Sequence, residues 1–334
     1  MKIAFFEIEK WEEEYMKQGL KGFEMTFTEN HLDAENISLA KDCEIISVFT
    51  LSQIDKEVLS KLPALKAIAV RATGFDSIDI EEAKKMGILV SNVPTYGENT
   101  VAEHTFGLIL NLSRQIHRSI QSVKEKGFIP DGLRGFDLKG KTLGIVGTGH
   151  IGSHVARIAK GFEMNVLAYD AKQDKKLAKN LGFEYVSLED LLKNSDIITL
   201  HLPYNKNTHH LINSSNISLI KKGSYLVNTA RGGLVETAAL VGALENGTLA
   251  GAGLDVLEEE CYIQDERELL TKGFPQKCDV KTLLQNHVLM ERENVIITPH
   301  NAFNSKEALE RILETTVENI KAFVSGKPSN VVRI

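Results

Sequence analysis

The chain has 334 residues, of which 43% are hydrophobic and 25% charged, a composition typical of globular proteins. Its formal net charge of −6 argues against a nucleic-acid-binding surface, and its three widely spaced cysteines fit a reducing cytoplasm rather than a disulfide framework or a metal site. The length predicts two domains, and no apolar run forms a secretion signal or reaches the roughly 20 residues of a membrane span.

Short apolar runs alternate with helical periodicity along the whole chain, which is typical of parallel α/β sheets. In the first part of the chain, strands are predicted near residues 2–6, 44–49, 66–71 and 88–91. In the second part, they are predicted near residues 142–146, 165–169, 196–202, 224–229, 250–256 and 295–298.

A long helix is predicted between these two groups of strands, over about 100–120, with Asn99 as its N-cap. Its apolar residues lie on one stripe, and Gly107 near the middle permits close approach of another helix. The stripe either packs inside its own domain or contributes to a dimer, and the sequence leaves both readings open.

A second long helix is predicted over about 305–324, and Gly326 and Pro328 end it. It follows the last strand of the second half of the chain. It can pack against that half or cross back to the N-terminal half, and the periodicity does not decide between them.

A glycine-rich tract with G-x-G-x-x-G spacing follows the strand predicted at 142–146, and helical periodicity follows the tract over 153–160. The first glycine permits a tight turn, the second lets backbone approach a pyrophosphate, and the third lets the helix pack closely on the strand. The tract therefore predicts a dinucleotide site. The predicted contacts come from Gly147, Gly149, His150, Ile151 and Gly152.

The strand predicted at 165–169 leads into Asp170, which lies 18 positions beyond Gly152. A carboxylate there can accept a hydrogen bond from a ribose 2′-hydroxyl and repel a 2′-phosphate. No arginine follows directly, although Lys172 does, so NAD is predicted rather than NADP. The alternative is a glycine-rich turn in another α/β fold, with Asp170 as a solvated residue.

Charged side chains follow three later strands, at the carboxyl ends where open parallel sheets bind ligands. They are Arg231, the acidic residues from Asp255 to Glu260, and His300. Arginine binds carboxylates bidentately, histidine moves protons near neutral pH, and an adjacent carboxylate orients a histidine. Together they predict a site for proton transfer to an anionic substrate.

Each of these residues also has a structural interpretation. Arg231 can pair with a surface acid, His300 can be a strand-end histidine with satisfied hydrogen bonds, and the run Glu258–Glu260 can form a solvated face. His201, after the strand predicted at 196–202, competes with His300 for the acid/base role. The adjacent His209 and His210 are expected in a polar loop.

Several motifs in a fixed order make the chain similar to the D-isomer-specific 2-hydroxyacid dehydrogenase family over essentially its whole length. They are Arg71–Asp76, Val93–Tyr96, Leu143–Gly152, Asn228–Gly232, Gly253–Val256 and Thr298–His300. The resemblance implies a Rossmann-type doubly wound NAD domain, residues 99–301, inserted into a smaller flavodoxin-like α/β substrate domain, residues 1–98 and 302–334. Pairing of NAD domains in the family implies a homodimer.

The resemblance also implies residue roles. Arg231 binds the substrate, Glu260 pairs with the histidine, and His300 is the acid/base, so these three are the predicted catalytic residues. Further cofactor contacts are implied for His201, Pro203, Thr229, Ala230 and Asp255, with Asp255 facing the nicotinamide amide. Substrate contacts are implied for Ala72, Thr73, Gly74, Phe75, Tyr96 and Phe303.

Within the family, residues 300–303 and Tyr96 most resemble the D-lactate dehydrogenase branch, which implies NADH-dependent reduction of pyruvate to D-lactate. The alternatives are 2-oxoisocaproate, glyoxylate or hydroxypyruvate as substrate, or an NAD(H)-gated binding protein without catalytic activity. One departure from the family is the distance of 40 positions from Glu260 to His300, which places extra chain within 261–290.

Overall fold

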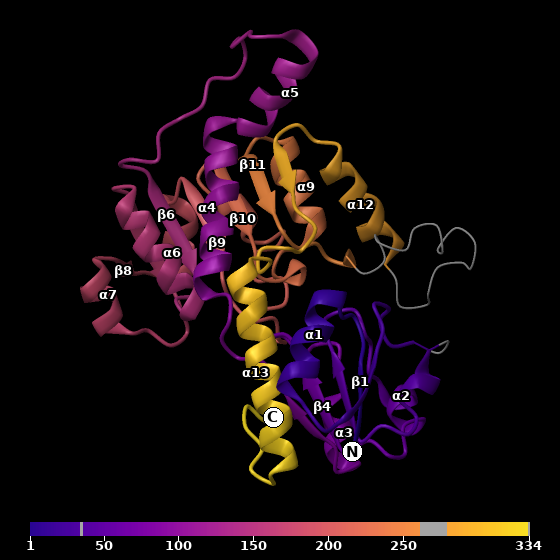
Figure 1. Cartoon of the computed structure of the whole chain (residues 1–334). Coiled ribbons are helices and arrows are strands. Elements are labelled where there is room, and N and C mark those ends of the chain that lie inside the picture. Colours follow the sequence, from indigo (N-terminus) through magenta and orange to yellow (C-terminus); the bar gives the residue numbers. More distant parts are fainter. Residues whose placement is uncertain (34–35, 261–278, 333–334) are drawn as a thin grey trace. The chain divides into compact units, whose positions relative to one another are not determined.

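The computed structural model describes residues 1–33, 36–260 and 279–332, which form two compact units (Figure 1). The first unit comprises Met1–Tyr96 and Ser305–Ile334, and the second comprises Gly97–Asn304. Each unit contains one parallel β-sheet with helices on both faces, so the predicted α/β class is confirmed.

The first unit has a five-stranded sheet in the order β2-β1-β3-β4-β5. Its strands are β1 (Lys2–Phe5), β2 (Glu24–Phe27), β3 (Ile45–Val48), β4 (Ala67–Val70) and β5 (Leu89–Ser91). An order of 2-1-3-4-5 is that of flavodoxin-like sheets, which agrees with the predicted fold. Its helices are α1 (Lys10–Gly19), the 3₁₀ helix η1 (Ile37–Leu39), α2 (Lys56–Ser60), α3 (Ile80–Lys85) and α13 (Lys306–Val324).

Helix α13 belongs to this first unit although it is encoded last. The hydroxyl of Ser305 caps it by accepting a hydrogen bond from the Ala308 N–H at 3.2 Å. The helix packs against α1 and β4, and its buried face joins one of the two apolar clusters of the sheet. A Cβ atom added at Gly19 would lie 2.8 Å from Val317, so α1 and α13 approach each other closely at this point.

The second unit has a seven-stranded sheet in the order β12-β11-β10-β9-β6-β7-β8. Its strands are β6 (Thr142–Val146), β7 (Asn165–Tyr169), β8 (Glu184–Tyr185), β9 (Ile197–Leu200), β10 (Ser224–Asn228), β11 (Leu249–Leu254) and β12 (Val295–Ile297). Numbered from β6, the order is that of a doubly wound Rossmann sheet with one added edge strand, which confirms the predicted fold.

Helices cover both faces of this second sheet. They are α4 (Glu98–Arg114), α5 (Ile116–Lys126), α6 (His150–Gly161), α7 (Lys175–Leu181), α8 (Leu188–Asn194), η2 (Ile217–Leu219), η3 (Gly232–Leu234), α9 (Thr237–Glu245) and α12 (Val280–Met290). Successive strand residues point to opposite faces: Ile197 packs in the cluster with α4 and α6, and Ile198 in the cluster with α8 and α9. Burial on both faces explains why these strands are continuous apolar runs.

The structure corrects several local predictions. The helix predicted over 100–120 is two helices, because Gln115 has a left-handed φ of 50° between α4 and α5. Its N-cap is Gly97 rather than Asn99, which lies inside α4. The helix after the glycine tract begins at His150, three residues before the predicted start.

Two strands were not predicted, β2 and β8. Both are edge strands of their sheets, and neither is a fully buried apolar run. The second part of the extra chain predicted within 261–290 forms α12, and residues 261–278 lie outside the described residues. Among the described residues, no helix is both long and apolar enough to cross a membrane.

Candidate functional site

The turn between β6 and α6 has the geometry of an anion-binding helix N-terminus. Gly147 adopts a φ of 99°, and a Cβ there would lie 2.6 Å from the His201 carbonyl oxygen. A Cβ at Gly152 would overlap the Gly147 carbonyl oxygen, so only glycine lets α6 pack this closely on the turn. A Cβ at the exposed N-cap residue Gly149 would meet no atom within 4 Å, so open space lies before the unpaired N–H groups of the helix.

Asp170 is held beside this turn. One carboxylate oxygen accepts hydrogen bonds from the Thr148 N–H at 2.7 Å and the Thr148 hydroxyl at 3.2 Å. The other oxygen accepts one from the Lys172 N–H at 2.8 Å. A helix N-terminus for a pyrophosphate and a fixed carboxylate for a ribose hydroxyl fit NAD, with the five predicted turn residues and Asp170 as the groups that would hold it.

The remaining candidate residues of this unit gather at the same edge of the sheet. Strands β9, β10, β11 and β12 are neighbours and parallel, so their carboxyl ends lie side by side. The residues that follow these strands include His201 and Pro203, Thr229 to Arg231, Asp255, and His300.

His300 and Glu260, 40 positions apart, form a direct pair. The Nδ1 atom of His300 lies 2.6 Å from the Glu260 carboxylate, whose other oxygen accepts the Leu257 N–H at 3.0 Å. The side chains of His300 and Glu260 are 34% and 35% exposed, so the pair can be reached from solvent. Because the carboxylate engages Nδ1, a proton exchanged with a ligand would pass through Nε2.

The backbone of His300 has a left-handed φ of 50°, which is uncommon for a residue with a side chain. Asp255 stabilises this loop and is only 1% exposed. Its carbonyl oxygen accepts the His300 N–H at 2.8 Å, and its carboxylate accepts the N–H groups of Asn301 and Ala302 at 3.0 and 2.9 Å. The Thr298 hydroxyl also donates to this carboxylate, at 2.5 Å. The buried carboxylate therefore fixes the loop that presents the imidazole ring.

Arg231 follows β10 in a turn held by the buried side chain of Asn228. The Asn228 amide donates to the Arg231 carbonyl oxygen at 2.8 Å and accepts the Ala230 N–H at 3.1 Å. The guanidinium donates from Nη1 to the Ala230 carbonyl oxygen at 2.7 Å. The neighbouring Thr229 hydroxyl lies 2.9 Å from that of Thr105 on α4.

His201 differs from His300 in its electrostatic environment. Its Nε2 lies 2.9 Å from the Thr199 hydroxyl, and its buried Nδ1 has no partner among the described residues. Burial lowers the pKa of His201 from 6.5 to about 3, although part of the residue remains exposed. A ring that is neutral at pH 7 does not suit the role of proton donor, for which the two histidines competed.

The predicted substrate segment 72–75 lies in the first unit, directly after β4. The Thr73 hydroxyl donates to the Val93 carbonyl oxygen, and the Asn92 amide donates to the Thr73 carbonyl oxygen, both at 2.8 Å. The Tyr96 carbonyl oxygen, in the same unit, accepts a hydrogen bond from Arg311 at 2.6 Å. Phe303 lies in the second unit, close in sequence to His300.

One residue of this region was missed by the sequence interpretation. His104 on α4 has its Nε2 3.1 Å from the Thr298 hydroxyl and 3.5 Å from the Asp255 carboxylate. The available signal was a histidine between Val101 and Leu108, on the buried stripe of its helix. This contact spans 194 positions in sequence, so periodicity could place His104 on the helix but could not identify its partners.

Comparison with known proteins agrees with this geometry. The pattern of the family described as D-isomer specific 2-hydroxyacid dehydrogenase, NAD binding domain, matches residues 106–302. The chain is 36% identical to D-lactate dehydrogenase of Escherichia coli, with 98% of each chain covered. It is 39% identical to glyoxylate reductase of Aeropyrum pernix, over 89% of this chain and 84% of that protein.

A solved structure of D-lactate dehydrogenase from Aquifex aeolicus, complexed with NAD and lactic acid, is also similar. The two chains share 41% identity with a TM-score of 0.87, covering 97% of this chain and 96% of the other. The NAD-binding-domain family matches most of the second unit, so NAD is the cofactor of this protein and its reaction is a dehydrogenation. The chain belongs to the D-isomer-specific 2-hydroxyacid dehydrogenase family.

Proposed function

We propose that this NAD-dependent 2-hydroxyacid dehydrogenase reduces pyruvate to D-lactate. The observation that carries the proposal is the pair of His300 and Glu260, 2.6 Å apart at the carboxyl end of the same sheet that carries the nucleotide turn. Similarity to D-lactate dehydrogenases of Escherichia coli and Aquifex aeolicus supports pyruvate as the substrate. Glyoxylate is the second candidate, because the relative from Aeropyrum pernix is a glyoxylate reductase of similar identity.

In the proposed reaction, His300 is the proton donor. Glu260 holds Nδ1 and orients the ring, so that Nε2 delivers its proton to the carbonyl oxygen of the 2-oxo acid. Arg231 binds the substrate and stabilises negative charge that develops on the same oxygen. Bound NADH supplies the hydride that reduces C2. In the reverse direction, neutral His300 acts as the base.

We assign the second unit as the NAD domain and the first as the substrate domain, whose segment from Ala72 to Phe75 provides backbone groups for the substrate carboxylate. Tyr96 and Phe303 contribute apolar surface for a small substituent on C2. The cofactor contacts are those of the nucleotide turn and Asp170, together with His201, Pro203, Thr229, Ala230 and Asp255. For Asp255, the hydrogen bonds to the 298–302 loop support a structural contribution to this region as well.

The test is NADH oxidation with pyruvate, 2-oxoisocaproate, glyoxylate and hydroxypyruvate, each repeated with NADPH. We expect the highest kcat/KM with pyruvate and NADH, and a D-configured product by chiral chromatography. A higher kcat/KM with glyoxylate selects the second candidate. Tight NADH binding without turnover of any 2-oxo acid contradicts the enzymatic proposal and favours a binding protein.

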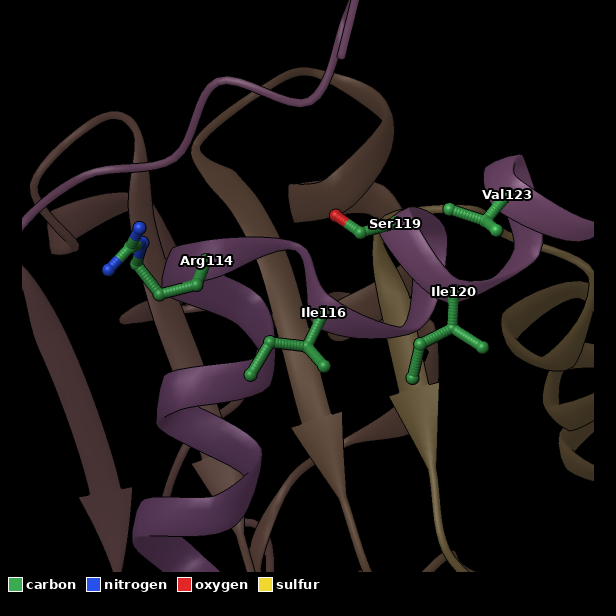
Figure 2. A pocket seen from close by; sticks show the side chains of 5 residues that line it. All are labelled: Arg114, Ile116, Ser119, Ile120 and Val123. Carbon is green, nitrogen blue, oxygen red and sulfur yellow. The ribbon is translucent and has the colours of Figure 1, made fainter. Parts of the chain in front are cut away.

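We also propose a homodimer formed through the second unit. The stripe on α4 is buried within its own unit, so the contact is assigned to α5 instead. Figure 2 shows a hollow along α5, with the side chains of Ile116 and Ile120 on the same side of the helix. These side chains and Val123 are 43%, 54% and 46% exposed, and a second copy of the chain would cover them.

Sedimentation equilibrium tests the dimer. Ile120→Asp is expected to shift the protein towards monomer, whereas Leu284→Asp, at a residue 61% exposed on α12, is expected to leave the association unchanged. Equal association of the two variants contradicts an interface on α5. The cytoplasmic location stays a prediction from the cysteine pattern, to be checked by fractionation of the native host.

A further inference from the structure

Glu260 lies at the end of a short turn that follows β11, and the side chain of Glu258 in that turn is hydrogen-bonded to residues outside it. We propose that Glu258 and His210 are positioning residues for the reaction: together they hold residues 257–260 so that the Glu260 carboxylate reaches His300. The proposal deepens the function above, because it rests on the roles assigned there to Glu260 and His300.

Both oxygens of the Glu258 carboxylate are hydrogen-bonded within the protein. One oxygen lies 2.6 Å from Nε2 of His210, and the other accepts the N–H and hydroxyl of Thr237 at 2.9 and 2.6 Å. The side chains of Glu258 and His210 are only 16% and 32% exposed. This carboxylate therefore points into the protein, whereas a solvated acidic face was one interpretation of the run from 258 to 260.

The same network reaches the loop that carries Arg231. The backbone N–H of His210 donates to the Gly233 carbonyl oxygen at 2.8 Å. A Cβ added at Gly232 would overlap the backbone of Leu257 and Glu258, so the two turns are in direct contact. Through these contacts, the Glu258–His210 pair connects the segments that supply Arg231 and Glu260.

Helix α12 provides a further anchor. The Asn286 amide is fully buried and donates to the Glu258 carbonyl oxygen at 2.7 Å. Helix α12 packs against α9, which begins at Thr237, and Thr237 is the other donor to Glu258. The part of the 261–290 segment that the structure describes thus contributes to holding the turn.

The turn needs such anchors because its backbone is strained. Glu259 has a left-handed φ of 55°, a conformation that a residue with a side chain rarely adopts without support. The contacts of Glu258 precede this residue, and the contact between Glu260 and His300 follows it. If Glu258 loses its partners, the turn can relax and move the Glu260 carboxylate away from the imidazole ring.

The test begins with Glu258→Gln, which keeps the size of the side chain but places an amide against the donors on Thr237 or His210. We expect kcat for 2-oxo acid reduction to fall by about 10-fold or more, because small displacements of catalytic groups lower reaction rates by this much. The Kd for NADH, from fluorescence titration, is expected to stay within about two-fold, since the nucleotide turn is not touched. His210→Gln should give the same pattern from the other side of the pair.

Glu259→Gln is the matched control. It removes the same charge from the same turn, but among the described residues its side chain accepts no hydrogen bond, so kcat is expected to stay near wild type. If Glu259→Gln and Glu258→Gln lower kcat equally, the effect is one of charge and the proposal is overturned.

A double-mutant cycle with Glu260→Gln separates positioning from general loss of structure. If Glu258 acts through Glu260, adding Glu258→Gln to the Glu260→Gln variant changes kcat by less than about two-fold. A full loss in both backgrounds, or a normal kcat in Glu258→Gln, overturns the proposal. If Glu260→Gln and His300→Gln themselves retain wild-type kcat, the proposed function fails first and this inference falls with it.

Discussion

Replacement of His201 by glutamine tests the assignment of the proton donor through protein stability. Burial lowers the pKa of this ring from 6.5 to about 3. Between these values the unfolded chain binds a proton that the folded chain does not. His201 therefore destabilises the fold increasingly as the pH drops below about 6.5, and the effect is complete near pH 3. At pH 5 these two pKa values correspond to about 2 kcal/mol relative to pH 8, an upper value because the residue is partly exposed.

The assay is denaturant unfolding of the wild type and His201→Gln at pH 8 and pH 5. The chain's single tryptophan, Trp11, lies in the first unit, so its fluorescence does not report on the second unit. The relevant transition is the one, followed by circular dichroism, that moves to higher denaturant when NADH is added. Wild type is expected to lose up to about 2 kcal/mol more than His201→Gln between the two pH values.

His209→Gln is the control, because His209 is exposed in the loop that follows. It should retain the pH dependence of the wild type. If His201→Gln also retains it, or if the His201 ring titrates near pH 6.5 by NMR, the ring is not held neutral by burial. His201 would then compete again with His300 for the acid role.

Three further predictions concern the site itself. His300→Gln is expected to lower kcat by about 10²-fold or more with little change in the Kd for NADH, because the reaction loses its general acid. Near-normal kcat in this variant, together with an inactive His201→Gln variant, would overturn the assignment. Asp170→Ala is expected to raise the ratio of kcat/KM for NADPH to that for NADH by about 10-fold or more. NADH loses a charge-assisted hydrogen bond to its ribose, and the repulsion between the carboxylate and the 2′-phosphate of NADPH is removed. An unchanged ratio contradicts the role of this carboxylate. Gly152→Ala places a Cβ against the Gly147 carbonyl oxygen and should raise the Kd for NADH about 10-fold. Gly161→Ala in the same helix places its Cβ in open space and should leave the Kd unchanged. Titration of both variants with NADH shows whether the close packing at Gly152 matters for binding.

The sequence predicted the elements whose pattern is local. The ten predicted strands are apolar runs because both faces of each sheet are covered, and helical periodicity located the segments that form α4, α5, α6 and α13. The glycine spacing and Asp170 predicted the nucleotide turn, because the tight turn, the close packing and the carboxylate each require a particular residue type. The edge strands β2 and β8 were missed because neither is a buried apolar run. The break at Gln115 was missed because one left-handed residue does not interrupt the apolar pattern of the helix.

Only the tertiary structure decided which distant segments of the chain are in contact. Periodicity alone allowed α13 to pack on either half of the chain, and the structure places it on α1 and β4. Composition and spacing left two histidines and a run of three acids as candidates, and the resemblance alone favoured one pairing. In the structure Glu260 faces His300, and Glu258 faces His210. The physical reason is that strand order and the backbone conformation of turns decide which strand ends become neighbours, and no short stretch of sequence encodes either.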